Sequence, residues 1–71
     1  MTYELWDLRN RNSLGTFTSR AEAFGAVRSI TQEQPDLVPD LQLDGEDADG
    51  EQVLKVTGQE LAELAEYRAY A

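Results

Sequence analysis

The sequence contains no cysteine and no histidine, and these two absences exclude several kinds of site. Without cysteine there is no disulfide, no thiolate ligand for a metal and no thiol redox chemistry. Without histidine, the chain also lacks the commonest side chain for proton transfer and metal binding near neutral pH. A domain of this size buries only about 60% of its unfolded surface, so its stability is marginal. We therefore expect no metal and no cofactor, and self-association is a candidate source of added stability.

Long apolar runs are also missing. Charged or polar residues interrupt every apolar stretch well before the length needed to cross a bilayer. The opening Met1-Thr2-Tyr3-Glu4 lacks the basic region of a secretory signal. These features predict a cytoplasmic protein that makes no contact with a membrane. The length of 71 residues predicts a single domain over residues 1–71.

Basic residues are scarce, and the net charge of −8 is spread unevenly. Residues 1–32 hold three acids and four bases, whereas residues 33–71 hold eleven acids and two bases. One interpretation is that the acids form solvated loops and helix faces that keep the protein soluble. Another is that the acidic half docks on a basic partner, such as a nucleic-acid-binding protein. Direct binding of nucleic acid is disfavoured, because phosphate contacts need clustered Lys and Arg and the turn Arg9-Asn10-Arg11-Asn12 supplies only two.

No arrangement of residues predicts catalysis. The remaining candidates for proton transfer are carboxylates, tyrosines and Lys55, and none of them lies in a recognisable motif. The glycines form neither a phosphate-binding loop nor a dinucleotide fingerprint. We therefore expect that the chain is not an enzyme and has no catalytic residue.

The acidic segment Asp44–Glu51 contains the spacing Asp47-x-Asp49-Gly50, which is similar to part of an EF-hand loop. Gly45 and Val56 stand where that loop needs its first and twelfth ligands. The segment therefore predicts a solvated hairpin loop and no strong calcium site.

Two helix starts share the pattern Ser/Thr-x-x-Glu, at Ser19-x-x-Glu22 and at Thr57-x-x-Glu60. In this capping box the hydroxyl accepts a hydrogen bond from the third helical amide, and the Glu reaches back to the cap amide. The first helix is predicted over Arg20–Glu33 and cannot continue past Pro35, and the second runs from about Gly58 towards the end. Each helix has one apolar stripe, formed by Ala23, Phe24, Val27 and Ile30 in the first and by Leu61, Leu64 and Ala65 in the second, where Arg68 continues the same stripe.

Two features near the first helix lead to further predictions. A glycine in a helix interior destabilises the helix by about 0.5–1 kcal/mol relative to Ala. The usual reason for accepting this cost is close backbone packing, so Gly25 predicts close packing against the sheet or its edge. The segment Pro35–Asp40 is too short and too rich in proline for an element of its own. It predicts a connector in which Leu37 and Val38 fill the gap between helix and sheet.

Four short segments are predicted strands, and they form two hairpins: Tyr3–Leu8 with Leu14–Thr18, and Leu41–Leu43 with Val53–Val56. The first hairpin turns at Arg9–Ser13, and the second turns at Asp49-Gly50. The predicted fold is α+β with the order ββαββα, a four-stranded antiparallel sheet with two helices packed on one face. The order of the strands in the sheet stays open.

The first predicted strand is apolar on both sides. Tyr3 and Leu5 share one face with Val53, and Trp6 shares the other with two leucines, Leu8 and Leu54. One interpretation is that a few of these residues are ordinary exposed apolar side chains. Otherwise the two short helices cover one face and the second face is an interaction surface. The candidate interface residues are Tyr3, Leu5, Trp6 and Val53, and the hairpin register decides which set is exposed.

The functional prediction is a non-catalytic protein-interaction module that forms a homodimer or binds a protein partner through this apolar face. The alternative is an acidic decoy or inhibitor that occupies a basic surface of a nucleic-acid-binding protein. The two differ in salt dependence, because salt screens charged contacts and leaves apolar ones in place.

The opening Tyr3-Glu4-Leu5-Trp6-Asp7-Leu8, the segment Leu14-Gly15-Thr16-Phe17 and the capped helix at Glu22-Ala23 resemble a group of short bacterial proteins. A Leu41-x-Leu43 strand and a helix opening Gly58-x-Glu60-Leu61-Ala62 extend the resemblance over nearly the whole chain. It implies a bacterial single-domain protein and transfers no site residues, since the group has no assigned activity. The turn Arg9-Asn10-Arg11-Asn12 departs from the glycine-containing turn of that group.

Overall fold

The computed structural model describes residues 1–70, with side chains as far as Glu66. Its elements follow the predicted ββαββα order, with strand ends within three residues of those expected. The strands are β1 (Thr2–Asp7), β2 (Asn12–Phe17), β3 (Leu41–Glu46) and β4 (Gln52–Thr57). The α-helices are α1 (Arg20–Glu33) and α2 (Gly58–Tyr70), and a short 3₁₀ helix, η1 (Pro35–Asp40), joins α1 to β3. Neither α-helix has the length and apolar character needed to span a bilayer within the described chain.

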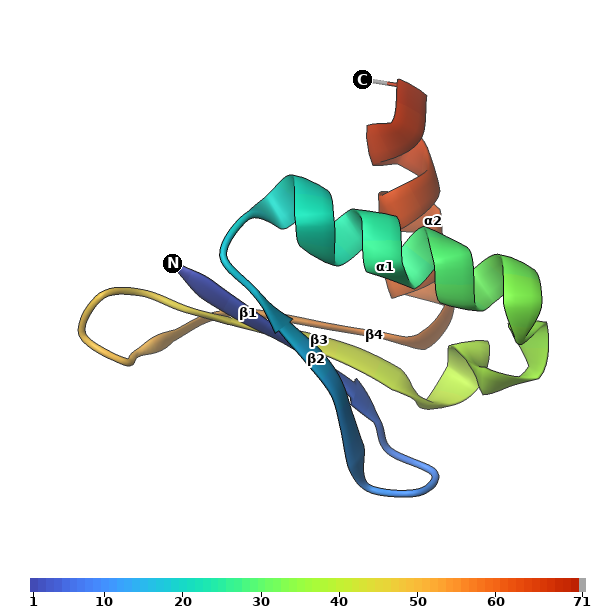
Figure 1. The fold of residues 1–71 in the computed structure, drawn as a ribbon, viewed down its shortest axis with the longest axis horizontal. Helices are drawn as coiled ribbons and strands as arrows, with labels where there is room; N and C mark the ends of the chain where they lie inside the picture. Colours follow the sequence, from blue (N-terminus) through green and yellow to red (C-terminus); the bar gives the residue numbers. More distant parts are fainter. Residues whose placement is uncertain (71) are drawn as a thin grey trace.

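The four strands form one antiparallel sheet in the order β2-β1-β3-β4. Each hairpin is contiguous in sequence, and the pairing of β1 with β3 joins the two hairpins at the centre. Both helices lie on the same side of the sheet (Figure 1), so the predicted α+β fold is confirmed. The opposite side of the sheet has no helix over it in this part of the chain.

Strict alternation along the central strands separates the two faces of the sheet. In β1, Tyr3, Leu5 and Asp7 are buried, and in β3 the same holds for Leu41, Leu43 and Gly45. The register between β1 and β3 places the buried residues of the two strands opposite each other, with Leu5 opposite Leu43 and Tyr3 opposite Gly45. The helices cover them with five buried apolar residues: Ala23, Phe24 and Val27 from α1, and Leu61 and Ala65 from α2. This is the core, and it lies between the sheet and the helices.

Both edge strands contain a bulge. Leu14 is the extra residue in β2, and Val53 is the extra residue in β4. Gly15 follows the first bulge at φ +149°, and the Phe17 ring lies so close to it that a β-carbon there would be 3.2 Å from the ring. Bulges interrupt the regular row of amides and carbonyls on an edge strand, which protects the edge from pairing with another chain.

The two helix starts differ, although they share a sequence pattern. The Ser19 hydroxyl accepts a hydrogen bond from the Glu22 amide at 3.1 Å, so the predicted N-cap at Ser19 is confirmed. The Glu22 carboxylate accepts from the Ser19 hydroxyl at 3.1 Å, and none of the described hydrogen bonds joins it to the cap amide as predicted. At the second start, Thr57 is still part of β4, opposite Gln42, and none of the described side-chain hydrogen bonds joins it to Glu60. Gly58 makes the turn from strand to helix with φ +59°. The second capping box is therefore a wrong prediction, because a left-handed glycine performs the change of direction.

Gly25 also differs from its predicted role. A β-carbon at this position would meet only the Arg28 guanidinium, at an ordinary 3.7 Å. The expected close packing against the sheet is wrong, and Gly25 is only partly buried on α1. Close approach to glycine occurs instead at Gly45, where a β-carbon would stand 3.0 Å from the Leu54 side chain.

The segment Pro35–Asp40 is an element of its own, which corrects the prediction of a plain connector. A 3₁₀ helix tolerates proline at its first turn, where Pro35 stands, because no helical hydrogen bond uses that amide. Leu37 is buried, as expected for a residue that fills the gap beside the core.

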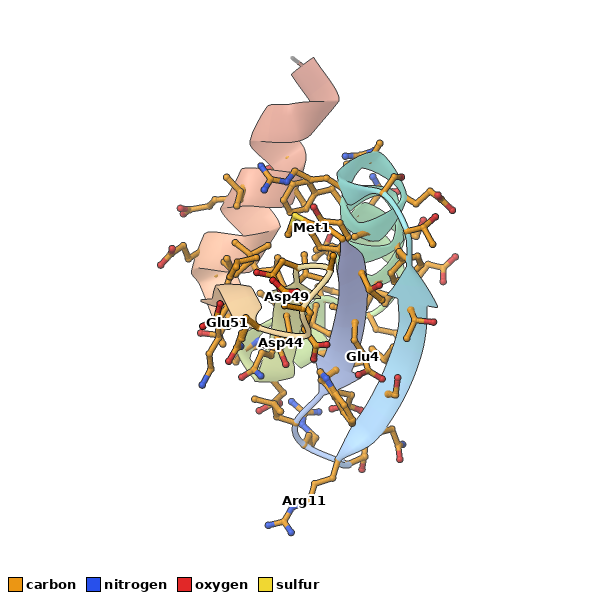
Figure 2. The ribbon with its side chains drawn as sticks, turned by 90° about the vertical axis from the view of Figure 1, so that its left-hand side faces the viewer. Met1, Glu4, Arg11, Asp44, Asp49 and Glu51 are labelled. Atoms are coloured by element: carbon orange, nitrogen blue, oxygen red, sulfur yellow. The ribbon has the colours of Figure 1, made fainter. Side chains whose placement is uncertain are left out.

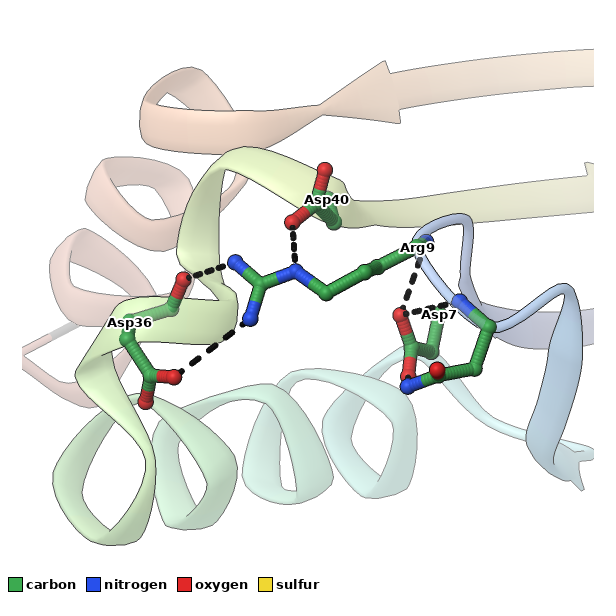
Figure 3. A network of polar contacts seen from close by, with 5 residues as sticks. Asp7, Arg9, Asp36 and Asp40 are labelled. Atoms are coloured by element: carbon green, nitrogen blue, oxygen red, sulfur yellow. Dashed lines mark hydrogen bonds and ion pairs between the residues drawn. The ribbon is translucent and has the colours of Figure 1, made fainter.

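Polar contacts fix this 3₁₀ helix to the β1–β2 turn (Figure 3). Arg9 donates from Nε to the Asp40 carboxylate at 2.8 Å and from Nη2 to the Asp36 carbonyl at 2.8 Å. The hydrogen bond to Asp40 raises the pKa of Arg9 further above neutrality. Beside it, the buried Asp7 accepts from the Asn10 side chain at 2.8 Å and from the Arg9 amide at 2.9 Å. The Asn10 side-chain bond holds the pKa of Asp7 below its usual value, against the opposing effect of burial.

Candidate functional site on the open face of the sheet

The side of the sheet that carries no helix, which we name the open face, is mainly polar. Its residues alternate with the core residues along each strand and stay aligned across the sheet by the strand register. They are Thr2, Glu4 and Trp6 from β1, Ser13 and Thr16 from β2, Gln42, Asp44 and Glu46 from β3, and Gln52, Lys55 and Thr57 from β4.

The structure separates the four candidate interface residues. Tyr3 and Leu5 are buried beneath the helices and belong to the core. Trp6 lies on the open face and is partly buried, and Val53 is the exposed extra residue of the β4 bulge, with 53% of its surface accessible. Tyr3 and Leu5 are therefore not available to a partner, whereas Trp6 and Val53 are.

The predicted grouping of apolar residues by face is wrong in two places. Leu54 lies opposite Gly45 on the core side, with Tyr3 and Leu5, and not with Trp6. Leu8 lies beyond the end of β1 in the turn, so it is on neither face. The bulge at Val53 shifts the alternation of β4 by one residue, which sequence periodicity does not reveal. Apart from Trp6, the residues in register on the open face are polar, and Leu14 and Val53 are the exposed extra residues of the two edge-strand bulges.

Trp6 lies at a shallow hollow of about 230 Å³ on the open face. Two central strands and one edge strand supply its lining: Thr2, Glu4 and Trp6 from β1, Thr16 from β2, and Asp44 and Glu46 from β3. The hollow therefore combines one aromatic ring with three carboxylates, and none of its described lining residues is basic. Such a combination suits a cationic group, which an aromatic face and a carboxylate both attract.

Two of the three carboxylates of the hollow, those of Glu4 and Asp44, have neutral hydrogen-bond partners. Glu4 accepts from the Ser13 hydroxyl at 2.7 Å, and Asp44 accepts from the side-chain amides of Gln42 at 3.0 Å and Gln52 at 3.1 Å. Within the described side chains, the ion pairs are those of Arg9 with Asp36 and Asp40, at the far turn. Lys55 is in register with Asp44 across the strands but forms no ion pair there. Neutral groups therefore hold these carboxylates in place, and none of the described ion pairs balances their negative charge.

The β3–β4 loop carries three further acidic residues, Asp47, Asp49 and Glu51. Figure 2 shows Arg11 at the bottom of the view, away from Asp49 and Glu51. Within the loop, Asp47 accepts hydrogen bonds from the amides of Asp49 at 2.9 Å and Glu51 at 3.0 Å, and Gly50 turns the chain with φ +79°. Asp49-Gly50 is thus the predicted turn, and the Asp47 carboxylate closes it.

Asp44 and Glu46 were not predicted as surface residues of the sheet, because the predicted strand ended at Leu43 and both fell in the predicted loop. The signal was present, since Gln42, Asp44 and Glu46 alternate with Leu41, Leu43 and Gly45 over six residues. The glycine at the fifth position interrupted the apolar pattern, although it lies in the core against the Tyr3 ring.

No protein-family model, curated protein or solved structure matches this chain. The comparisons therefore leave the resemblance to a group of short bacterial proteins at the level of the ββαββα fold. Function has to be inferred from the open face itself.

Proposed function

We propose that this chain is a non-catalytic protein-binding module whose open face docks on a basic surface or segment of another protein. The observation that carries the proposal is the hollow at Trp6, where Glu4, Asp44 and Glu46 have no basic neighbour in ion-pair contact. An unbalanced charged face without a covering helix is complementary to a partner of opposite charge, and that complementarity speeds association and selects the partner. The net charge of −8 acts in the same direction at longer range.

The same observation disfavours homodimerisation through the open face. Two copies brought face to face would place their carboxylates against each other, and like charges in contact oppose association. The bulges in β2 and β4 disfavour pairing through the sheet edges. A protein partner of opposite charge is therefore the occupant that fits the face best, and direct contact with nucleic acid is disfavoured by the sign of the charge.

The acidic decoy is a special case of this proposal, in which the basic partner surface is one that otherwise binds nucleic acid. A cytoplasmic, bacterial setting belongs to the proposal too. It is supported by the cysteine-free sequence and by the resemblance of the Tyr3–Leu8 opening to short bacterial proteins.

The experiment compares two variants of equal charge. The face variant carries Glu4→Gln, Asp44→Asn and Glu46→Gln, and the control carries Glu33→Gln, Glu63→Gln and Glu66→Gln, three exposed positions on the helices. Each variant is immobilised and used to retain proteins from a host lysate at about 50 mM and about 500 mM salt. The proposal predicts a basic protein that the native chain and the control retain at low salt and the face variant does not. Equal retention by both variants would show that position on the open face is irrelevant and would contradict the proposal.

A further inference from the structure

The hollow at Trp6 has the composition of a site for one cationic side chain. Its lining holds a single aromatic ring and three carboxylates from two adjacent central strands. Cation–π attraction favours a cation over an aromatic face, most strongly for tryptophan, and carboxylates at the rim attract the same cation. A neutral or acidic side chain would gain neither contact.

The geometry points to the guanidinium of an arginine in the partner protein as the group that occupies this hollow. This inference rests on the proposed function and specifies the chemistry of its partner. A guanidinium is planar, so it can stack on the Trp6 ring while its edge donates to a carboxylate at the rim. An ammonium group is a compact, strongly hydrated charge and cannot do both with the same geometry.

The surroundings of the ring support a stacked ligand. Across the strands, Trp6 is opposite Ser13 on β2 and Gln42 on β3, two neutral residues that leave the ring without a basic neighbour of its own. Glu4 and Asp44 are directly opposite each other in the β1–β3 register, and both line the hollow with Trp6. Hydrogen bonds from Ser13 and from the two glutamines hold these carboxylates in place before a ligand arrives.

The hollow has a volume of about 230 Å³ and is open to solvent. The hollow is therefore large enough for the end of one side chain and too small for a larger part of a partner protein. A single side chain binds weakly on its own, and affinity for a whole partner would come from the rest of the face.

The test uses three blocked peptides, Gly-Gly-X-Gly-Gly with X as arginine, citrulline or lysine, so that the side chain is the only charge. Citrulline has the shape of arginine without its charge. Trp6 is the only tryptophan, so its fluorescence and its indole N–H signal in nuclear magnetic resonance report on this site alone. We expect the arginine peptide to bind about three- to thirty-fold more tightly than the citrulline peptide, and more tightly than the lysine peptide. Equal binding of arginine and citrulline peptides, or tighter binding of lysine, would overturn the inference.

Variants locate the binding. Trp6→Leu should weaken arginine-peptide binding about three- to thirty-fold, followed by the amide signals of Glu4 and Asp44, while Val53→Ala should leave it unchanged. If Trp6→Leu fails to fold, Glu46→Gln changes an exposed side chain and should still weaken binding measurably. Unchanged binding in a folded Trp6→Leu variant, or in Glu46→Gln where Trp6→Leu does not fold, would place the peptide elsewhere and overturn the inference.

The outcomes separate the inference from the proposed function. If no arginine peptide binds but the face variant still loses a basic partner, the proposed function stands and the arginine site is wrong. If the arginine peptide binds at Trp6 but the face variant keeps every partner of the native chain, the proposed function is contradicted.

Discussion

The ring of Tyr3 lies against Gly45 on the neighbouring strand, so closely that a β-carbon on Gly45 would stand 3.2 Å from ring atom Cε1. The same β-carbon would be 3.0 Å from Leu54. Gly45→Ala should therefore destabilise the fold by about 1–3 kcal/mol through overpacking. Gly25→Ala provides the contrast and should stabilise by about 0.5–1 kcal/mol, since only Arg28 is near and the helix loses its most flexible residue.

Urea unfolding of both variants beside the native chain measures the two effects. The account of the core requires changes of opposite sign. Two losses of similar size would mean that Gly25 is as closely packed as Gly45.

The helix starts should respond differently to alanine. Ser19→Ala removes the hydroxyl that accepts from the Glu22 amide and should cost about 1 kcal/mol. Gly58→Ala places a β-carbon on a residue at φ +59° and should cost about 1–2 kcal/mol. Thr57→Ala should cost less than either. Thermal unfolding checks the ranking, and a larger loss for Thr57→Ala than for Ser19→Ala would restore the second capping box.

Asp7 should make part of the stability depend on acid pH. Its pKa is lowered from 3.8 in the folded chain, chiefly by the Asn10 side chain, so the carboxylate binds its proton less readily folded than unfolded. Its contribution is complete well above pH 3.8 and is lost from about pH 5 downward, as the pH falls through the folded-state value. The stability difference between the native chain and Asp7→Asn should therefore shrink between pH 7 and pH 3. Urea midpoints of the two proteins give this difference. A difference that is independent of pH would contradict a stabilising role for the ionised Asp7 carboxylate.

Calcium should not stabilise the acidic loop. Asp47 already accepts from the amides of Asp49 and Glu51, and Val56 stands where a bidentate Glu is needed. The melting temperature should stay nearly constant up to about millimolar calcium. Differential scanning calorimetry with and without calcium, with magnesium as the control, measures this, and a clear rise at micromolar calcium would contradict the assignment.

The fold class was predictable because its signals are local. Capping at Ser19, the break at Pro35 and the turn at Asp49-Gly50 depend on neighbours a few residues apart, and all three are present in the structure. The start of α2 at Gly58 was placed correctly although the capping reason given for it was wrong.

The strand order was not predictable. It depends on which strand of each hairpin lies at the centre of the sheet, where a strand is paired on both sides and buries one face. β1 and β3 bury alternate residues along their length, whereas β2 and β4 carry the bulges at Leu14 and Val53. A bulge changes the face of every residue beyond it, so the grouping of Leu54 with Tyr3 and the polar character of the open face followed only from the three-dimensional register. The hollow at Trp6 required that register as well, since it combines Glu4 with residues about forty positions away in sequence.

The central claim, that the open face binds a basic partner, is tested most directly by mapping contacts on the isotope-labelled protein. An unstructured arginine-rich peptide of about ten residues is titrated into it at low salt, and backbone amide shifts are followed by nuclear magnetic resonance. The account predicts shifts at Glu4, Trp6 and Asp44, together with their strand neighbours, that disappear at high salt and in the face variant. Shifts concentrated on α1 or α2, or spread evenly over all acidic residues, would contradict it.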